Sequence, residues 1–441
     1  MGRKGRKKMT PNMDVFSGRM EDSRGASPGV RELQSLGVQV KGVEKILGEK
    51  EARHLLARAF QAKQTIFPCG GGTGLSSGVL PEKVDLALDT TGMSKVLDFD
   101  PQNLNLEVLA GMTLDQINEF LAGQGRGFFL PLDPPFSHRA TIGGAYAANS
   151  SGPLRHRYGT LRDQVLGVRG VDSRGQAVGF GGKTVKNVSG YDLTKFLIGS
   201  AGSLCLITSL AIRVYPLPEA SSLGDLVFGT LEELEKFLAA FRSSVLVPSA
   251  VVVTEIAGGP SVSSTAGARF RVITAFEGHR LAVERQNQDL LKLAGGFGGW
   301  GDARVGRKMV VRGLRSAVNP DRPLEASLIL RVSVPIGQGP RTFAGVQKLS
   351  HEHGLSVKPV LFAGNGFLIL YGEGTPHKKA IDFIRGLQEI IRAGEGFVAP
   401  VLAPIEILQA WGARVEPALH RLVYGPIKEK LDPSGVFPPI I

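Results

Sequence analysis

Residues 131–163 read PLDPPFSHRATIGGAYAANSSGPLRHRYGTLRD, with two proline corners, the pair Gly143-Gly144 and four arginines. Neither a helical period of 3.6 nor a strand period of 2 runs through this stretch, so burial of one face does not explain it. It is too apolar around Tyr146 to remain in water, and long loops inside compact domains are usually functional. We therefore expect an ordered loop that lies against a large bound molecule.

The composition is that of a globular protein with more than one domain. The 441 residues exceed the ~250–300 at which single cores stop growing. Fifty-eight glycines make up about 13% of the chain, against a usual ~7%, which indicates unusual backbone conformations or close contact with a ligand. The two cysteines, Cys69 and Cys205, are too few for a disulfide framework and lack zinc-site spacing, as expected for a protein of a reducing cytosol.

The net charge of +12 comes partly from the first eight residues, MGRKGRKK, which supply five positive charges. Residues 1–40 are polar and aperiodic, and we expect them to be a mobile basic tail. The alternative is that this segment binds nucleic acid, but it has no interleaved aromatic residues and no recognition helix. No apolar run reaches the ~18 residues of a membrane span. The expectation is a cytoplasmic protein without nucleic acid and without a membrane span.

Periodicity and capping signals predict many short elements in the first half. We expect helices at 43–60, 114–121 (with Thr113 as N-cap) and 193–198, and strands at 65–67, 84–88, 104–109, 165–171, 177–180 and 203–215.

The second half differs in style after Pro218. Residues 327–402 follow a β-α-β-β-α-β order, the ferredoxin-like arrangement, and residues 225–294 repeat it without an evident sixth strand. We expect one antiparallel sheet there and an α+β fold overall.

The segment CGGGTGLSSG, residues 69–78, follows a predicted strand. Consecutive glycines let main-chain N–H groups converge on an anion without a Cβ in the way. The segment is not a G-x-G-x-x-G turn, because no helix opens directly after it, and it lacks the P-loop lysine. A mobile surface loop is the alternative. Together with Thr141–Gly144 it would suit the two phosphates of a pyrophosphate.

Five ordered motifs carry a resemblance to a known family: PCGGGTG, PLDP followed by ATIGG, NSSGPLRHRYGTLRD, KTVKNVSGYDL and GSAGSLCLIT. Their order and spacing resemble the FAD-binding (PCMH-type) domain of the vanillyl-alcohol-oxidase and para-cresol-methylhydroxylase superfamily. Within it, RYGTLRDQVLGVRGVDSRG and GGKTVKNVSGYDLTK are most similar to the FAD-binding subunit of glycolate oxidase. The resemblance implies an FAD-binding domain at 41–217, an FAD-linked oxidase-type cap at 218–430, and a C-terminal segment, 431–441, that returns to the FAD domain.

The resemblance also implies roles for matching residues. Main-chain N–H groups of the first loop would hold the pyrophosphate, and Thr141–Gly144 would pass beneath it. Asn149, Ser151, Gly152 and Tyr158 would lie near the isoalloxazine, and Gly202, Leu204 and Ile207 near the adenine. The full set of expected cofactor contacts is Gly70, Gly71, Gly72, Thr73, Gly74, Pro131, Asp133, Thr141, Ile142, Gly143, Gly144, Asn149, Ser151, Gly152, Tyr158, Gly202, Leu204 and Ile207.

Two departures affect the ends of this expected site. Cys205 stands where the family often has glycine, and Pro438 stands where an asparagine is usual. Neither His138 nor His156 belongs to a motif for covalent flavin attachment, so we expect non-covalent FAD.

The sequence contains fewer motifs for substrate binding than for flavin binding. Oxidation of a 2-hydroxy acid needs a base for the hydroxyl proton and a cation for the carboxylate. The H-x-G-D-G-N motif of similar single-chain dehydrogenases is absent, and His351-Glu352-His353 does not have metal-ligand spacing on a helix. No metal is expected and the catalytic residues are unknown. Arg155 and Arg331 are the candidates for the cation. Arg331 is on a predicted strand, and the alternation of that strand allows its side chain to point either to the substrate or to solvent.

The resemblance implies an FAD-binding subunit of a glycolate-oxidase-like complex that oxidises glycolate or D-lactate. Its partners would be a paralogous flavoprotein and an iron–sulfur subunit, through which the chain could lie peripheral to the inner membrane. Two alternatives stay open: a stand-alone FAD-dependent dehydrogenase or oxidase for a 2-hydroxy acid or alcohol, and a non-catalytic flavin-fold scaffold.

Overall fold

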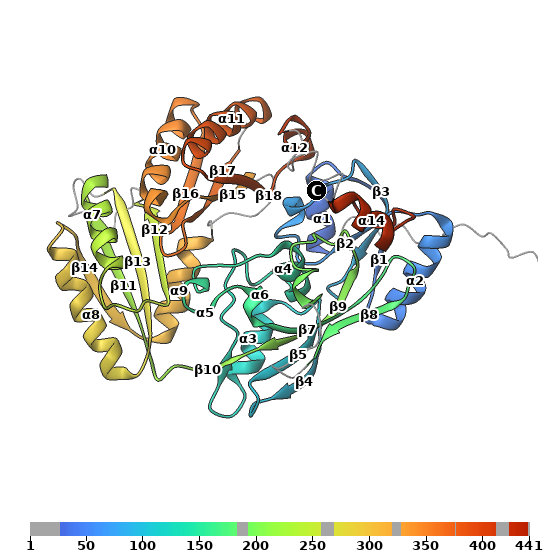
Figure 1. Cartoon of the computed structure of the whole chain (residues 1–441), viewed down its shortest axis with the longest axis horizontal. Coiled ribbons are helices and arrows are strands. Elements are labelled where there is room, and N and C mark those ends of the chain that lie inside the picture. Colours follow the sequence, from blue (N-terminus) through green and yellow to red (C-terminus); the bar gives the residue numbers. More distant parts are fainter. Residues whose placement is uncertain are drawn as a thin grey trace, which may run out of the picture.

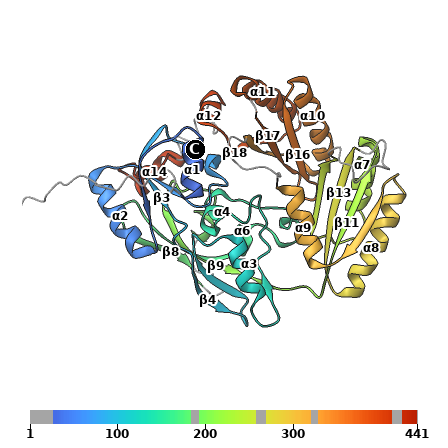
Figure 2. The ribbon, with the colours of Figure 1, turned by 180° about the vertical axis from the view of Figure 1, so that it is seen from behind.

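The computed structural model describes residues 27–182, 193–256, 269–319, 328–374, 376–411 and 423–439. They form two lobes that lie side by side (Figures 1 and 2). Most of the chain up to Pro216 builds the first lobe, the chain after it builds the second, and the C-terminal helix lies on the first lobe (Figure 1). The predicted motif KTVKNVSGYD lies outside the described residues.

The first lobe holds a parallel sheet of order β1-β3-β2 and an antiparallel sheet of order β4-β5-β9-β7-β8. A two-stranded ribbon joins β6 to β10. The elements are α1 (Pro28–Ser35), β1 (Gln39–Lys45), α2 (Glu49–Ala62), β2 (Ile66–Cys69), η1 (Leu75–Ser77), β3 (Lys83–Asp89), β4 (Val96–Asp100), β5 (Asn105–Leu109), α3 (Leu114–Ala122), β6 (Phe128–Phe129), α4 (Ile142–Ala148), α5 (Arg155–Tyr158), α6 (Leu161–Gln164), β7 (Val165–Val171), β8 (Ala177–Gly181), η2 (Leu193–Lys195), β9 (Leu206–Arg213) and β10 (Tyr215–Pro216).

Several elements appear where the sequence predicted them. Thr113 caps α3 in a capping box: its hydroxyl accepts from Gln116 N at 3.2 Å, and Gln116 Oε1 accepts from Thr113 N at 2.9 Å. Residues 131–163 are ordered, as expected, and they include the three short helices α4, α5 and α6.

The prediction of a mobile tail over residues 1–40 is wrong for residues 28–40. Helix α1 occupies Pro28–Ser35, and β1 begins at Gln39. Val30 and Leu33 of α1 are 0% exposed, because they pack into a core formed by distant parts of the chain. Residues 1–26 lie outside the described residues.

Two helix predictions and one strand start also need correction. The helix predicted at 43–60 begins only at Glu49, after Gly48, whose backbone is extended. Residues 43–45 instead belong to β1, which pairs in parallel with β3. The helix predicted at 193–198 is a short 3-10 turn, Leu193–Lys195, and β9 starts at Leu206 rather than at residue 203.

The second lobe is one eight-stranded antiparallel sheet, as predicted, of order β14-β11-β13-β12-β16-β17-β15-β18. Its elements are β11 (Ala220–Phe228), α7 (Leu231–Arg242), β12 (Ala250–Glu255), β13 (Phe270–Gly278), α8 (Arg280–Gly295), β14 (Trp300–Val305), α9 (Arg307–Val318), β15 (Leu328–Ser333), η4 (Ile336–Gln338), α10 (Gly339–Glu352), β16 (Ser356–Phe362), β17 (Phe367–Glu373), α11 (His377–Ala393) and β18 (Phe397–Leu402).

The first half of this sheet does have the closing strand of the β-α-β-β-α-β order, its sixth element, contrary to the prediction. It is β14, an edge strand paired only with β11, and most of its residues are exposed or half-buried. An edge strand that is solvated on both faces shows little hydrophobic alternation, so its pattern is weak.

Helix α9, also not predicted, covers the face of the sheet opposite α8. A Cβ at Gly224 of β11 would meet Leu290 of α8, whereas Gly313 of α9 approaches the neighbouring Leu223. Successive residues of a strand point to opposite faces, so the two helices lie on opposite faces. Figure 1 shows α9 between the sheet and the first lobe.

The chain returns to the first lobe earlier than residue 431. Ile405 N, in α12 (Ile405–Trp411), donates to Leu36 O at 2.9 Å, and Ala403 N donates to Ser76 Oγ at 3.0 Å. Helix α14 (Gly425–Leu431) and the segment after it then lie on the first lobe, where Ile66 N donates to Val436 O at 2.6 Å.

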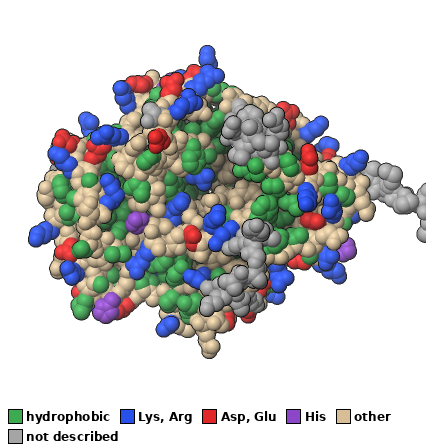
Figure 3. Space-filling model, viewed as in Figure 1, with side chains coloured by type: hydrophobic (Ala, Val, Ile, Leu, Met, Phe, Trp, Pro, Cys, Tyr) green, Lys and Arg blue, Asp and Glu red, His purple; other side chains and the backbone are tan. Residues whose placement is uncertain are grey.

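The surface charge is dispersed on the face drawn in Figure 3, where basic and acidic side chains alternate over both lobes. Among the described residues, no helix is long and apolar enough to cross a membrane.

Candidate functional site: a glycine cradle between β2 and α4

The predicted glycine loop follows β2 directly and lies against residues 139–141. A Cβ on Gly71 would stand 1.7 Å from the carbonyl oxygen of Arg139, and a Cβ on Gly70 would stand 2.4 Å from Thr141 Oγ1. Real Cβ atoms do not approach backbone oxygen this closely, so glycine is required for the two loops to touch.

A second feature of this loop is its main-chain N–H groups. Among the described residues, no acceptor is found for the main-chain N–H groups of residues 70–74. Buried or half-buried N–H groups are nearly always paired in native proteins. A row of unpaired N–H groups therefore forms a concave anion-binding surface.

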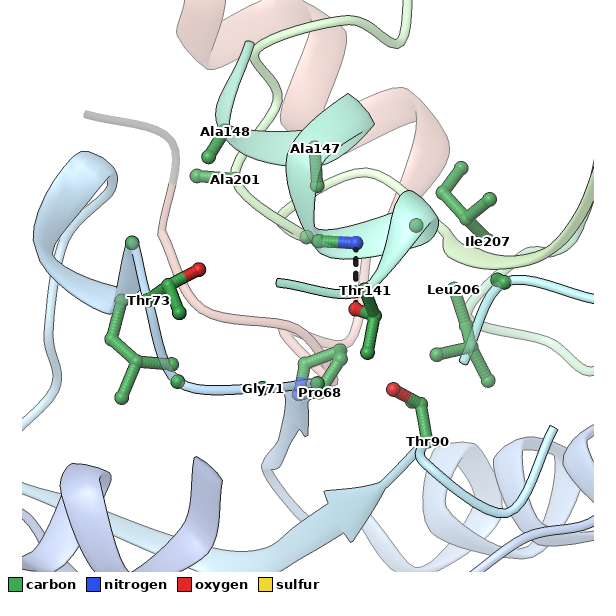
Figure 4. A pocket seen from close by; sticks show the side chains of 18 of the residues that line it. Pro68, Gly71, Thr73, Thr90, Thr141, Ala147, Ala148, Ala201, Leu206 and Ile207 are labelled. Atoms are coloured by element: carbon green, nitrogen blue, oxygen red, sulfur yellow. Dashed lines mark hydrogen bonds between the residues drawn. The ribbon is translucent and has the colours of Figure 1, made fainter. Parts of the chain in front are cut away.

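Helix α4 forms the opposite wall of the cavity. Thr141 is its N-cap, and its hydroxyl accepts from Gly144 N at 3.2 Å. A Cβ on Gly143 would stand 2.7 Å from the Cβ of Ala110. The Gly-Gly pair thus lets α4 lie directly on the loop before α3. Figure 4 shows Ala147 across the cavity from Gly71, with the Thr141 bond drawn as a dashed line.

The cavity encloses about 760 Å³ of empty space, including the part open to solvent. It is lined by Phe67, Pro68, Gly70, Gly71, Gly72, Thr73, Gly74, Leu75, Thr90, Ala110, Thr141, Gly143, Gly144, Ala147, Ala148, Ser150, Ala201, Gly202, Cys205, Leu206 and Ile207. Narrow walls of small side chains and free N–H groups at the loop fit an extended dinucleotide.

Ten of the predicted cofactor residues line this cavity: Gly70, Gly71, Gly72, Thr73, Gly74, Thr141, Gly143, Gly144, Gly202 and Ile207. The sequence did not single out most of the remaining lining, which consists of small or aliphatic residues such as Ala147, Ala148 and Ala201. Alanine at these places carries no motif, so only the tertiary structure identifies them.

The other eight predicted residues lie outside the lining: Pro131, Asp133, Ile142, Asn149, Ser151, Gly152, Tyr158 and Leu204. Ile142 is fully buried and Leu204 is 6% exposed. Asn149 ends α4 with a left-handed backbone, φ 49°. Ile142 and Leu204 therefore belong to the core behind the wall, whereas Asn149 is exposed.

Asp133 and Gly152 join the two ends of the 131–163 stretch. The Asp133 carboxylate accepts from Leu154 N at 3.1 and 3.3 Å, and a Cβ on Gly152 would meet Asp133 O at 1.8 Å. Burial raises the pKa of Asp133 well above its usual range, and the nearby charge of Glu277 raises it further. The close contact holds residues 150–152 beside the cradle.

Tyr158 faces the second lobe. Its hydroxyl donates to Glu277 Oε2 at 2.9 Å, Arg157 Nη1 donates to Glu277 O at 2.6 Å, and Arg307 Nη1 lies 3.4 Å from Glu277 Oε1. Burial and the Glu277 carboxylate raise the pKa of Tyr158. This network joins α5 to β13 and α9, so it ties the lobes together.

Arg155 and Arg331, the candidates for a substrate cation, lie on the two lobes. Arg155 Nη1 donates to Ser151 Oγ at 3.0 Å, and its guanidinium lies 4.9 Å from the centre of the Phe367 ring. Arg331 is in the middle of β15, between β17 and β18, and is half-buried.

The histidines form no metal site in the described part of the chain, where no group of three or more His, Cys, Asp or Glu side chains is arranged around a common point. His351 and Glu352 end α10 on the exposed surface. His156 contacts the main chain of Gly364 in the turn between β16 and β17, and burial lowers its pKa.

Comparison with known proteins agrees with this geometry. Residues 47–181 match the family model described as FAD binding domain. Glycolate oxidase subunit GlcD of Bacillus subtilis is 29% identical over 237 residues, which cover 54% of this chain and 48% of that protein. D-lactate dehydrogenase of Archaeoglobus fulgidus is 35% identical over 43% of this chain and 42% of its own length. Glycolate oxidase subunit GlcE of Escherichia coli is 37% identical over 30% of this chain and 38% of its own length. The matches thus span less than half of each relative.

Among solved structures, p-cresol methylhydroxylase superposes with a TM-score of 0.69 at 16% identity, over 92% of this chain and 91% of that chain. At this identity the likeness shows the fold alone. The α+β fold class, the resemblance to para-cresol-methylhydroxylase-type flavoproteins and FAD as the cofactor are confirmed by these comparisons.

Proposed function

Because the chain carries an FAD-binding domain in a fold of the para-cresol-methylhydroxylase type, we propose that it is the FAD-binding subunit of a glycolate-oxidase-like complex. The complex oxidises a small 2-hydroxy acid, glycolate or D-lactate, and passes the electrons to a partner. The names of the relatives GlcD, GlcE and D-lactate dehydrogenase support this assignment. The FAD-binding part would comprise the chain from residue 28 to 217 with the C-terminal segment from residue 403, and the cap would comprise 218–402.

The observation that carries the proposal is the cradle of unpaired N–H groups at residues 70–74, set against α4. These N–H groups would hold the pyrophosphate, and Gly202 and Ile207 would adjoin the adenine. Ser150 lines the cavity near Gly74, and it lies between Asn149 and Ser151, which are expected near the isoalloxazine. Bound FAD would supply the acceptor for the hydride of the substrate.

Non-covalent attachment follows from the cavity lining. Among its residues only Cys205 has a side chain of the kind used for flavin linkage. That thiol is buried, and burial raises its pKa to about 12, so little thiolate exists at neutral pH. Acid precipitation of the purified chain should release all of its FAD into the supernatant. A yellow pellet would contradict non-covalent binding.

The need for partners rests on the substrate side. None of the described residues forms a metal cluster, and the motif H-x-G-D-G-N is absent. A paralogous flavoprotein and an iron–sulfur subunit would complete the chemistry, and a cytoplasmic assembly at the inner membrane surface is part of this proposal.

Purification of the chain alone distinguishes the proposal from its alternatives. If glycolate or D-lactate reduces the bound FAD only after the partner subunits are added, the chain acts as a subunit of a complex, as proposed. Reduction by either acid without partners supports a stand-alone dehydrogenase or oxidase. A colourless chain that binds no added FAD supports a scaffold without turnover.

A further inference from the structure

We infer that Arg155 and Arg331 together form a carboxylate-binding site where the two lobes meet, beside the cradle. This inference rests on the proposed function in one respect: the carboxylate would be that of the hydroxy-acid substrate.

Strand register places both guanidinium groups over the same face of the second-lobe sheet. Arg331 of β15 lies directly opposite Ile369 of β17, and paired residues of neighbouring strands project from the same face. Phe367, two residues before Ile369, shares that face. The guanidinium of Arg155, from the first lobe, lies 4.9 Å from the centre of the Phe367 ring.

Neither arginine forms an ion pair with a described residue. Among the described residues, no carboxylate lies within 4.0 Å of either guanidinium group. Arg331 Nε is buried and has no acceptor there. A buried donor without an acceptor is costly, and more so when it is charged.

The two charges also repel each other. Burial lowers the pKa of Arg331, and the charge of Arg155 lowers it further. Burial lowers the pKa of Arg155 as well, partly offset by Asp163. Two half-buried cations that repel each other over one sheet face are unfavourable, and a carboxylate bound by both would supply the missing acceptors in bidentate geometry.

Other arginines at the lobe boundary show what a structural role looks like. Arg307 lies 3.4 Å from Glu277, and Arg315 Nη2 lies 2.7 Å from Asp115 Oδ1. Both have acidic partners, as expected of residues that hold the lobes together. Arg155 and Arg331 differ from them in this respect.

The position relative to the cradle fits a substrate site. Arg155 Nη1 donates to Ser151 Oγ at 3.0 Å, and the preceding residue, Ser150, lines the cavity. A carboxylate held by Arg155 would thus lie next to Ser151, the neighbour of a residue that lines the cradle.

The test uses oxalate as the probe and the full chain as purified, titrated by isothermal calorimetry. Wild type is expected to bind oxalate, and Arg331→Met and Arg155→Met each to bind it about 10- to 100-fold more weakly, the range for loss of a charge-assisted pair. Arg331→Lys keeps the positive charge but loses the bidentate guanidinium geometry, so its affinity for oxalate should be intermediate. Arg304→Met is the matched control, because Arg304 is an exposed second-lobe arginine paired with Asp302.

Thermal unfolding separates a binding role from a structural one. Without oxalate, Arg331→Met should melt no lower than wild type, because one of two repelling charges is gone; with oxalate it should lose the increase in melting temperature seen in wild type. Equal oxalate affinity in wild type and Arg331→Met, or no binding to wild type at millimolar oxalate, would overturn the inference. So would a clearly lower melting temperature of Arg331→Met without oxalate.

The same preparations distinguish this inference from the proposed function. Oxalate binding that depends on Arg331 in a chain that retains no FAD would leave the anion site standing and refute the flavin subunit. FAD that glycolate reduces equally well in wild type and Arg331→Met, and only after the partner subunits are added, would support the flavin subunit and refute the anion site.

Discussion

Replacing Lys428 with methionine tests how the C-terminal segment is held on the FAD-binding lobe. The Lys428 ammonium group lies 2.7 Å from Asp432 Oδ2 and 2.7 Å from the carbonyl oxygen of Ser203. It also donates to the carbonyl oxygens of Phe437 and Pro438, at 3.1 and 3.0 Å. The side chains of Lys428 and Asp432 are only 16% and 0% exposed.

The magnitude follows from that burial. Without Lys428, the Asp432 carboxylate would stay buried with two N–H donors, those of Val436 at 2.9 Å and Phe437 at 2.8 Å. Removing one partner of a buried pair costs about 3–5 kcal/mol. Domains are stable by about 5–15 kcal/mol, so this is a large share. Because Ser203 follows Gly202 of the cavity wall, FAD retention should fall as well.

The assay is urea denaturation, with the free energy of unfolding extrapolated to water. Lys428→Met should lower it by about 3–5 kcal/mol, and adding Asp432→Asn should recover part of the loss because the uncompensated charge is gone. Lys236→Met is the matched control: Lys236 is paired with Glu232 at the same spacing and 2.6 Å, but both side chains are exposed, 61% and 75%. It should unfold like wild type. A loss below about 1 kcal/mol for Lys428→Met, or a double variant no more stable than the single one, would refute the reasoning.

Three further predictions address the cradle and its surroundings. Gly71→Ala should abolish FAD retention, because its Cβ would stand 1.7 Å from a backbone oxygen, whereas Gly123→Ala, with no atom nearer than 3.5 Å, should retain FAD; the flavin-to-protein absorbance ratio measures both. The raised pKa of Asp133 means that the folded state keeps a proton which the unfolded state releases near pH 4, so stability falls as pH rises from there. Asp133→Asn should flatten that dependence in urea titrations at pH 5 and 7. Cys69 and Cys205, both buried with raised pKa values, should not react with a thiol reagent at pH 8 until urea is added; rapid reaction of the native chain would contradict this.

Local features of the fold could be predicted from the sequence because their causes lie within a few residues. The capping box of α3 is complete within residues 113–116. The turn between β7 and β8 is fixed by Asp172, whose side chain accepts from Arg174 N and Gln176 N. Interactions of this range leave a signature in any short window of sequence.

Elements whose burial depends on distant partners were missed or misplaced. Helix α1 is buried through a core that includes Ile407, more than 370 residues away. Strand β14 depends on register with β11, and its own residues are mostly solvated. Neither short-range periodicity nor propensity records such contacts.

The glycine cradle could be predicted from the sequence, because glycine is needed where two backbones come into contact, and that need is visible residue by residue. The order of the motifs around residues 131–163 likewise predicts FAD as the cofactor. The surroundings of the cradle could not be predicted in this way, because they come from elements that are distant in the sequence. The tertiary structure turned Tyr158 to Glu277 in the other lobe, and it brought Arg155 and Arg331 to one sheet face. The physical reason is that a charged side chain takes its role from the charges near it in space, and those come from another lobe.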